Sequence, residues 1–266
     1  MPDAPMVSVL TTCYNQSGSV GRALDSVRMQ QTPWPIQHVV VDDGSTDGTQ
    51  EVFRNRMGYE LHLRRHHGLM GAYLFGFAQC HGRYIALCDG DDYWLTADKL
   101  AWQVAYMEAH PNCGACFTWA LVEDEGTGAS YIATPGGGVG YDSLLRGTAV
   151  IFSPGVMIRA EWLDGALAVM AIHNMYTWDL PIYLHLTAHG WDIGYLPEVT
   201  AAYVKHVESF SNTHCRRRRL RYVWGVARVK WYFIRRYGCG IGTLAHCIYR
   251  LLRDLASVAL RRWYND

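Results

Sequence analysis

Three short apolar runs each end in polar side chains, and this pattern strongly limits the folds that the chain can adopt. The runs are VSVLTT (7–12), HVVV (38–41) and YIALC (84–88), and they lead into CYN, DDGS and DGDD. Apolar residues at helical spacing follow the first run over 18–30 and the third over 96–110. Alternating strands and helices predict an α/β fold with a mostly parallel sheet and helices on both faces.

Further elements are expected between and after these runs. A helix is expected from about 45 to 57, a strand near 61, a helix over 69–80 and a strand over 114–122. Ligands of such sheets bind at the carboxyl ends of the strands. The three polar motifs should therefore meet at one edge of the sheet.

The usual nucleotide-binding fingerprints are missing from this edge. A dinucleotide site would need G-x-G-x-x-G after the first strand, and a P-loop would need G-x-x-x-x-G-K-[ST]. Neither pattern occurs in the sequence. A phosphate would then have to be held by a metal ion.

The DGDD motif carries Asp89, Asp91 and Asp92 at the end of a buried strand. Carboxylates this close repel one another unless a cation offsets them. Asp89 and Asp91 form a DXD motif whose turn can direct both side chains at one Mn²⁺ or Mg²⁺, the ions that bind carboxylates together with phosphate oxygens. A solvated acidic turn is the alternative interpretation.

Composition indicates a globular protein of the reducing cytoplasm. Half of the 266 residues are hydrophobic, enough for a large core. The eight cysteines show no disulfide spacing, and the isolated Cys113-x-x-Cys116 pair lacks the four ligands of a structural zinc site. The start of the sequence predicts no signal peptide, and no run approaches the roughly 20 apolar residues of a transmembrane helix.

Charge is divided unevenly along the chain. Residues 215–266 hold 13 of the 24 Lys and Arg residues and only two acids, a net charge of +11, which leaves residues 1–214 at −11. Such asymmetry predicts an anionic partner for the basic part.

The basic segment also contains an amphipathic helical pattern. Its apolar positions are Ile248, Leu251, Leu252, Leu255, Val258 and Ala259. A basic amphipathic helix with Trp and Tyr suits an anionic membrane surface, here the cytoplasmic face of the inner membrane. The apolar face could instead pack on the rest of the chain or on a second subunit in a homo-oligomer. Nucleic acid is not expected as a partner because the body is acidic.

Five motifs together resemble the family-2 inverting glycosyltransferases of the GT-A fold, in particular the bacterial type that builds surface polysaccharides. The motifs are VSVLTTCYNQ, HVVVDDGSTDGT, GRYIALCDGDDYW, WDLPIYLHLTAHG and GYLPEVTAAYVKH. The resemblance covers about Val7 to Asn212. It implies metal-dependent transfer of a sugar from a nucleotide diphosphate sugar, expected to be UDP-linked, to a hydroxyl of a glycan or lipid-linked glycan.

The resemblance also implies a division of the chain. Residues 1–214 would form the GT-A catalytic domain, with a nucleotide-sugar half over about 1–112 and an acceptor half over about 113–214. Residues 215–266 would form a basic helical extension.

By this resemblance, Thr12, Tyr14 and the pair Asp42 and Asp43 hold the nucleotide base, and Asp89 lies beside the ribose and the metal. Tyr14 would stack on the base, and Asp43 would accept a hydrogen bond from it. Tyr14 could also be an ordinary strand-end tyrosine, and one aspartate of the pair could cap the following turn.

The metal ligands implied by the resemblance are Asp91 and His206. Asp92 and Lys205 would contact the donor or its phosphates, with Lys205 supplying the charge because Val204 stands where the family often has arginine. His206 could equally be a histidine without a metal role.

Asp179 is the catalytic base implied by the resemblance. It precedes Leu180 and Pro181 at the expected start of a helix, so the alternative is that it only caps this helix. A base that removes a proton from the acceptor hydroxyl assists sugar transfer with inversion. The alternative function is a non-catalytic nucleotide-sugar-binding or scaffold protein, but such a protein would usually have lost Asp91 or Asp179.

Overall fold

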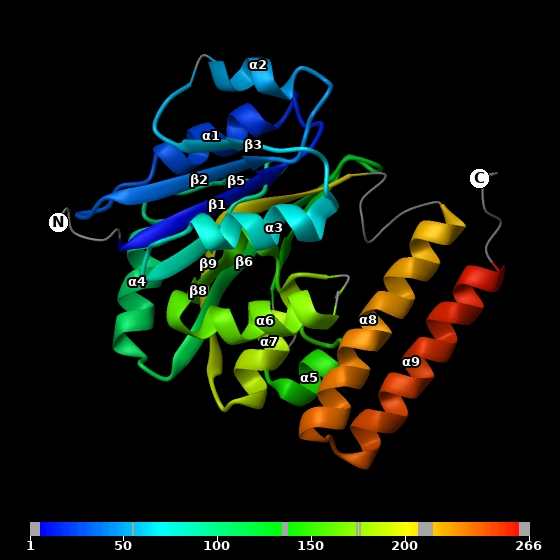
Figure 1. Ribbon diagram of the computed structural model, residues 1–266. Helices are drawn as coiled ribbons and strands as arrows, with labels where there is room; N and C mark the ends of the chain where they lie inside the picture. The colour runs from blue at the N-terminus through cyan, green and yellow to red at the C-terminus, as the bar shows by residue number, and fades with distance from the viewer. Residues whose placement is uncertain are drawn as a thin grey trace.

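The computed structural model describes residues 6–54, 56–134, 138–173, 175, 177–206 and 215–260, and Figure 1 shows their arrangement. In these ranges the strands are β1 (Val7–Cys13), β2 (Ile36–Asp42), β3 (Glu60–Leu63), β4 (Tyr84–Leu87), β5 (Tyr93–Trp94), β6 (Cys113–Asp124), β7 (Ala129–Ala133), β8 (Val156–Arg159) and β9 (Asp192–Lys205). The α-helices are α1 (Val20–Arg28), α2 (Thr49–Arg54), α3 (Gly68–Gln79), α4 (Lys99–Ala109), α5 (Tyr141–Arg146), α6 (Leu163–His173), α7 (Asp179–Ala188), α8 (Arg216–Tyr237) and α9 (Ile241–Leu260).

The first four strands form the parallel part of the sheet, in the order β3-β2-β1-β4. β1 pairs with β2 from Val7 opposite Ile36 to Cys13 opposite Asp42, and with β4 from Val7 opposite Tyr84. The carboxyl ends of β1, β2 and β4 therefore meet at one edge, as the sequence pattern predicts.

Beyond β4 the sheet is mixed rather than mostly parallel. β8 lies antiparallel between β4 and β6, β6 runs parallel to β9, and β5 pairs antiparallel with the far side of β9. β8 is a fully buried run of four residues, VMIR. Such a short run can be read as a buried strand, but its residues carry no signal of its direction.

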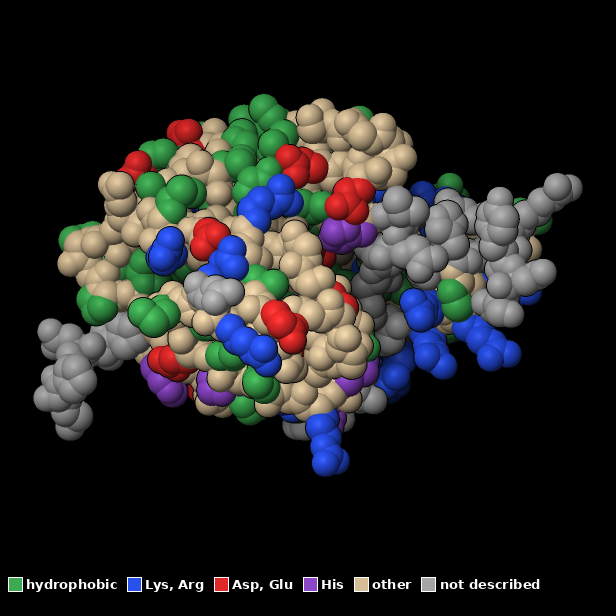
Figure 2. Space-filling model, turned by 90° about the horizontal axis from the view of Figure 1, so that it is seen from above, with side chains coloured by type: hydrophobic (Ala, Val, Ile, Leu, Met, Phe, Trp, Pro, Cys, Tyr) green, Lys and Arg blue, Asp and Glu red, His purple; other side chains and the backbone are tan. Residues whose placement is uncertain are grey.

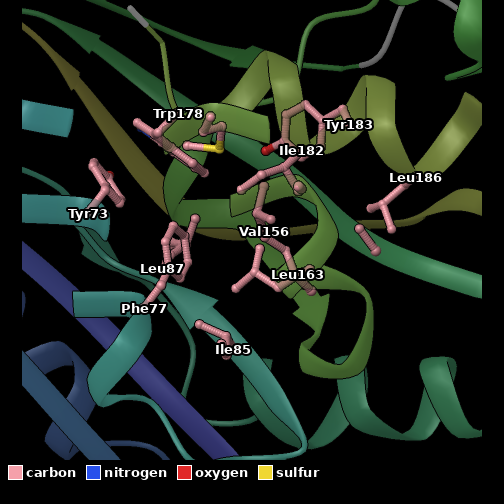
Figure 3. Packing of buried hydrophobic residues seen from close by; sticks show 14 of the residues in the cluster. Tyr73, Phe77, Ile85, Leu87, Val156, Leu163, Trp178, Ile182, Tyr183 and Leu186 are labelled. Atoms are coloured by element: carbon pink, nitrogen blue, oxygen red, sulfur yellow. The ribbon is translucent and has the colours of Figure 1, made fainter. Parts of the chain in front are cut away.

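Helices cover both faces of the sheet because successive residues of each strand point to opposite sides. Leu10 and Leu87 pack in one cluster with α3, α6 and α7, while Val9 and Ala86 pack in another with α1 and α4. Figure 3 shows the first cluster from close by, with side chains of α3 and α7 meeting over β4 and β8. The α/β architecture with helices on both faces is confirmed.

The basic segment folds as a pair of long antiparallel helices, α8 and α9, beside α5 and α7 (Figure 1). Val229 and Phe233 of α8 are fully buried, whereas Trp224, Trp231 and Leu252 are 51%, 55% and 62% exposed. The pair therefore packs on the body with one side and presents aromatic and aliphatic surface with another. Within the described ranges, no helix is both long and apolar enough to span a membrane.

A glycine before β4 allows this strand to lie against β1. A β-carbon on Gly82 would lie 2.3 Å from the backbone nitrogen of Ser8 and 2.7 Å from the carbonyl carbon of Val7. The backbone of β1 cannot move without disturbing its hydrogen bonds to two neighbouring strands.

We therefore expect Gly82→Ala to lower the free energy of unfolding by about 1–3 kcal/mol, the usual cost of overpacking. Gly18→Ala is the matched control because no atom lies within 4 Å of its added β-carbon. Thermal unfolding of the two variants and the parent chain would measure the difference. Equal stability of both variants would contradict this account of the β1–β4 contact.

Candidate active site

A cavity of about 990 Å³, here called the main cavity, opens at the carboxyl ends of β1, β2 and β4. Residues from α3, α7 and the start of α8 complete its wall. The expected site residues that line it are Thr12, Tyr14, Asp43, Asp89, Asp91, Asp92 and Asp179. The structure thus brings together seven of the ten residues that the sequence singles out.

The loops at this edge are held by side-chain hydrogen bonds between two motifs. Asn15 is the only non-glycine residue with positive φ in the described chain, at 53°, a conformation that asparagine tolerates well. Its Oδ1 accepts a hydrogen bond from the backbone N–H of Thr46 at 2.8 Å, and its own N–H donates to Ser45 Oγ at 2.8 Å. The CYN and DDGS loops therefore position each other.

The Asp42–Asp43 pair divides into one structural and one cavity-facing carboxylate. Asp42 is fully buried and accepts hydrogen bonds from Ser45 and from Gln50 Nε2, so it holds the turn and does not line the cavity. Asp43 lines the cavity and accepts hydrogen bonds from the backbone N–H groups of His67 and Gly68.

Tyr14 stands next to Asp43 at the same end of the cavity. Its ring stacks on His66 with 4.2 Å between centroids, and His66 Nδ1 lies 2.8 Å from an Asp43 carboxylate oxygen. Tyr14 is 43% exposed. This end therefore offers aromatic faces beside a carboxylate, a combination suited to a planar heterocycle.

The three aspartates of DGDD differ in their surroundings. Asp89 accepts hydrogen bonds from Thr12 Oγ1 at 3.0 Å and from the buried hydroxyl of Tyr73. Burial and the nearby Asp91 raise its pKa to about 6. Asp92 is 2% exposed and accepts a hydrogen bond from the backbone N–H of Val204 at 2.9 Å; burial and then its two neighbours raise its pKa well above the usual value.

His206 partly offsets this negative charge. Its Nε2 lies 3.1 Å from Asp91 Oδ2 and its Nδ1 lies 2.7 Å from Glu125 Oε2. The hydrogen bond to Asp91 is the main cause that raises the pKa of His206 to about 9, so the imidazolium form predominates at neutral pH. His206 is not in the cavity wall but supports Asp91 from behind.

Lys205 turns away from the main cavity. Its Nζ lies 2.5 Å from Asp124 Oδ2, across the β6–β9 pair. Lys205 thus forms an ion pair outside the site. Three expected residues, Lys205, Asp42 and His206, do not line the cavity.

Two cations of the basic segment line the main cavity. The sequence alone predicts them only as part of the basic tail. Arg218 and Arg221 extend from the first turns of α8, and neither forms an ion pair with a carboxylate in the described part of the chain. The RRRR run indicated positive charge, but only the packing of α8 against the body shows which arginines line the main cavity.

Asp179 enters the main cavity from the start of α7. It is the first residue of α7, the N-cap position being Trp178, and burial raises the pKa of its carboxyl group. The Trp178 ring stacks on Tyr73 at 4.4 Å between centroids. The same tyrosine that donates to Asp89 therefore also holds the residue next to Asp179.

The donor set of the main cavity fits a divalent cation. No group of three or more His, Cys, Asp or Glu side chains among the described residues surrounds a common point as a finished metal cage. Asp91 nevertheless lines the cavity, and burial together with the repulsion of neighbouring carboxylates raises the pKa of Asp89 and Asp92, an unfavourable effect that a cation would relieve. One or two carboxylates completed by phosphate oxygens are sufficient for Mg²⁺ or Mn²⁺.

Comparison with known proteins identifies the family. Residues 8–165 match the model of glycosyl transferase family 2. The chain belongs to this family. The resemblance noted from the motifs is therefore confirmed.

Relatives of this family-2 chain include a putative biosynthetic glycosyltransferase and an uncharacterised protein. The putative teichuronic acid biosynthesis glycosyltransferase TuaG of Bacillus subtilis is 29% identical over 238 residues, which cover 87% of this chain and 88% of TuaG. An uncharacterised protein of Mycobacterium tuberculosis is 30% identical over 211 residues, 75% of this chain. The match spans only 59% of the length of that relative.

Solved structures confirm the GT-A fold of this family member. TarS 1–349 of S. aureus in complex with UDP-GlcNAc superposes with a TM-score of 0.67 at 17% identity, covering 94% of this chain and 72% of TarS 1–349. The mannosyltransferase PcManGT of Pyrobaculum calidifontis in complex with GDP-Man and Mn²⁺ gives a TM-score of 0.60 at 18% identity, covering 99% and 77%.

We expect Asp91→Asn to weaken Mn²⁺ binding by more than about 10–100-fold, since changing even an outer-shell partner of a metal ligand costs that much. Calorimetric titration of Mn²⁺ in the presence of UDP would measure the change. Asp124→Asn is the matched control, because Asp124 pairs with Lys205 outside the cavity. Unchanged Mn²⁺ affinity in Asp91→Asn protein would contradict the metal assignment.

Proposed function

We propose that this chain is a metal-dependent inverting hexosyltransferase that moves a sugar from a nucleotide diphosphate sugar, UDP-linked, to a hydroxyl of a glycan or lipid-linked glycan in surface polysaccharide synthesis. One observation carries the proposal. The acidic turn of Asp89, Asp91 and Asp92 and the isolated carboxylate of Asp179 line the same cavity. A protein that only binds a nucleotide sugar has no need of the isolated carboxylate of Asp179.

Binding of the donor would begin at the base. The uracil ring would stack against Tyr14, and its N–H would donate a hydrogen bond to the carboxylate of Asp43. Asp89, held by Thr12 and Tyr73, would face the ribose. The His66 ring already stacks on Tyr14. The uracil ring would therefore either displace His66 or stack on the free face of one of these two rings.

The diphosphate would lie between the acidic turn and α8. Asp91 would hold a divalent cation, which when bound neutralises the charge of the leaving nucleoside diphosphate. Arg218 and Arg221 would face the same phosphates from α8 and add charge-assisted hydrogen bonds, the strong class of such bonds. His206 would keep Asp91 oriented through its bond to the carboxylate.

Asp179 would act as the general base. The oxygen of the acceptor hydroxyl forms a bond to the anomeric carbon, the bond from that carbon to the phosphate oxygen breaks, and the hydroxyl proton passes to Asp179. Attack from the side opposite the leaving group inverts the anomeric centre. Burial raises the pKa of Asp179 and so makes its carboxylate a better proton acceptor.

The relatives support this assignment in different ways. TuaG is named a putative glycosyltransferase of teichuronic acid synthesis, and WfaP of Escherichia coli, 30% identical over 39% of this chain, is named a glucosyltransferase acting from UDP-Glc on a GlcNAc-diphosphoundecaprenol. By analogy we assign residues 1–214 to catalysis, with the nucleotide-sugar half over about 1–112, and 215–266 to a helical extension that also serves the site.

We expect Asp179→Asn to retain UDP-sugar binding but to lower turnover by about 10²–10⁴-fold, the usual contribution of a general base. Turnover of the parent chain should fall on acidification with a midpoint above about 3.9, the ordinary pKa of aspartic acid. Asp164→Asn, which changes an exposed carboxylate of α6, is the control. Loss of donor binding with normal turnover per bound donor would assign Asp179 to binding instead.

The exposed side of the α8–α9 pair would hold the protein at the cytoplasmic face of an anionic membrane. Lys and Arg side chains gather on this pair at the right of Figure 2. Exposed apolar residues accompany them on both helices: Trp224, Trp231, Ile248, Tyr249 and Leu252. Charge attraction and shallow apolar insertion act together in such segments.

We expect the full chain to co-sediment with anionic liposomes at low salt and to dissociate at high salt, because exposed charges are screened within about 8 Å at physiological ionic strength. Replacing Arg216, Arg235 and Arg236 by Gln should weaken this binding by up to about 1 kcal/mol per residue. Neutral liposomes are the control. Absence of binding at low salt would assign the exposed surface to contacts between proteins.

A further inference from the structure

A second cavity, of about 700 Å³, lies between α7 and the α8–α9 pair. It adjoins the main cavity at the candidate base. The residues that line both cavities are Val150, Ile151, Thr177, Asp179 and Tyr222. A molecule in the second cavity can therefore reach Asp179.

The wall of this cavity is largely apolar. Aliphatic side chains from both long helices line it, among them Val223, Ile234 and Leu251. Trp224 and Trp231 also belong to the lining while being 51% and 55% exposed, so they stand where the cavity meets the surface. This apolar rim continues into the exposed aromatic and aliphatic surface of the helix pair.

Five cationic side chains belong to the cavity wall, namely Arg219, Arg228, Lys230, Arg250 and Arg253, and two of them lie together. The Lys230 Nζ and an Arg250 Nη atom lie 3.5 and 3.8 Å from the position of a β-carbon on Gly147, so the two charges face the same spot. Burial and the nearby Arg250 lower the pKa of Lys230. The buried Nε of Arg250 has no hydrogen-bond partner.

A carboxylate acts on Lys230 only through its longer-range charge, since Asp254 partly offsets the lowering of the Lys230 pKa. The acid in the cavity wall on the side of α9 is Asp254, and it pairs with Arg253 at 2.8 Å. Within the described chain neither Lys230 nor Arg250 has an ion-pair partner. Two adjacent cations in a partly buried apolar wall cost free energy unless an anion binds between them.

We propose that the second cavity is the acceptor site and that the acceptor is a sugar linked through phosphate to a long hydrocarbon chain. This inference rests on the proposed function and specifies its acceptor. The sugar hydroxyl lies at Asp179, the phosphate lies between Lys230 and Arg250, and the hydrocarbon chain leaves past Trp224 and Trp231 toward the membrane.

The spacing along α8 suits such a molecule. Tyr222 lines the junction with the main cavity, and Lys230 lies eight residues further along the same helix. With a rise of about 1.5 Å per residue the two positions are about 12 Å apart. A single sugar and its diphosphate, together with the reach of a lysine side chain, span this distance.

The probe for the experiment is geranylgeranyl diphosphate, which carries the phosphate and the chain without a sugar. Binding to the full-length protein is followed by tryptophan fluorescence, since Trp224 and Trp231 stand at the rim. We expect Lys230→Gln and Arg250→Gln each to weaken binding by at least about tenfold, the scale of a lost hydrogen bond to a charged group. Lys230→Arg should retain most of the affinity.

Arg28→Gln is the matched control, because Arg28 lies exposed on α1, outside both cavities and away from the α8–α9 pair. It should bind the probe like the parent chain. Geranylgeraniol, which lacks the phosphates, should bind more weakly than the diphosphate, and inorganic pyrophosphate should compete with the diphosphate.

Three outcomes would overturn the proposal. They are unchanged affinity in both glutamine variants, equal affinity for geranylgeraniol, and a dimer that binds no probe and dissociates when Trp231 is replaced by Ala. The last would assign the cavity to a second copy of the chain. UDP-sugar binding in the presence of Mn²⁺, measured on the same preparations, shows that each variant is folded. If the parent chain does not bind UDP-sugar, this result contradicts the proposed function independently of the acceptor site.

Discussion

The hydrogen bond from Tyr73 to Asp89 joins the two sides of the candidate site. Tyr73 is fully buried on α3, and its hydroxyl donates to the first carboxylate of the acidic turn. The other face of the same residue stacks on Trp178, which directly precedes Asp179. One rigid aromatic ring thus fixes the acidic turn and the start of α7 relative to each other. In our proposal the acidic turn holds the metal and Asp179 is the base, so their separation matters because small misplacements of reacting groups are costly.

Negative charge is the second constraint on this edge of the sheet. The parallel pairing of β1 with β2 and β4 brings their acidic ends together, and Asp89, Asp91 and Asp92 then repel one another. The structure offsets this repulsion with His206 behind Asp91 and with Arg218 and Arg221 across the cavity. In our proposal a divalent cation and the diphosphate of the donor complete this balance. The basic segment and the acidic body, which are separate in the sequence, therefore meet in the wall of the main cavity.

Helix α8 has three roles because its faces differ. Its first turns direct arginines into the main cavity, its middle lines the second cavity with Val223 and Lys230, and its outer side exposes Trp224 and Trp231. In our proposal this basic amphipathic helix therefore belongs to the catalytic body and also faces the membrane. The two interpretations of the basic segment, packing and membrane binding, are compatible because they concern different faces of the same helices.

Much of the fold and of the site could be predicted from the sequence, since strand polarity and turn residues are local signals. The apolar runs with polar ends predict β1, β2 and β4, and parallel pairing then places Asp43, Asp89 and Asp91 at one edge. Only the tertiary structure shows that β8 runs antiparallel, that Asp42 holds the turn, and that Lys205 pairs with Asp124. It also places Arg218 and Arg221 of α8 in the wall of the same cavity that the acidic turn lines. These features depend on contacts between segments far apart in the chain, whose register and direction follow from the packing of the whole core and leave no local periodicity in the sequence.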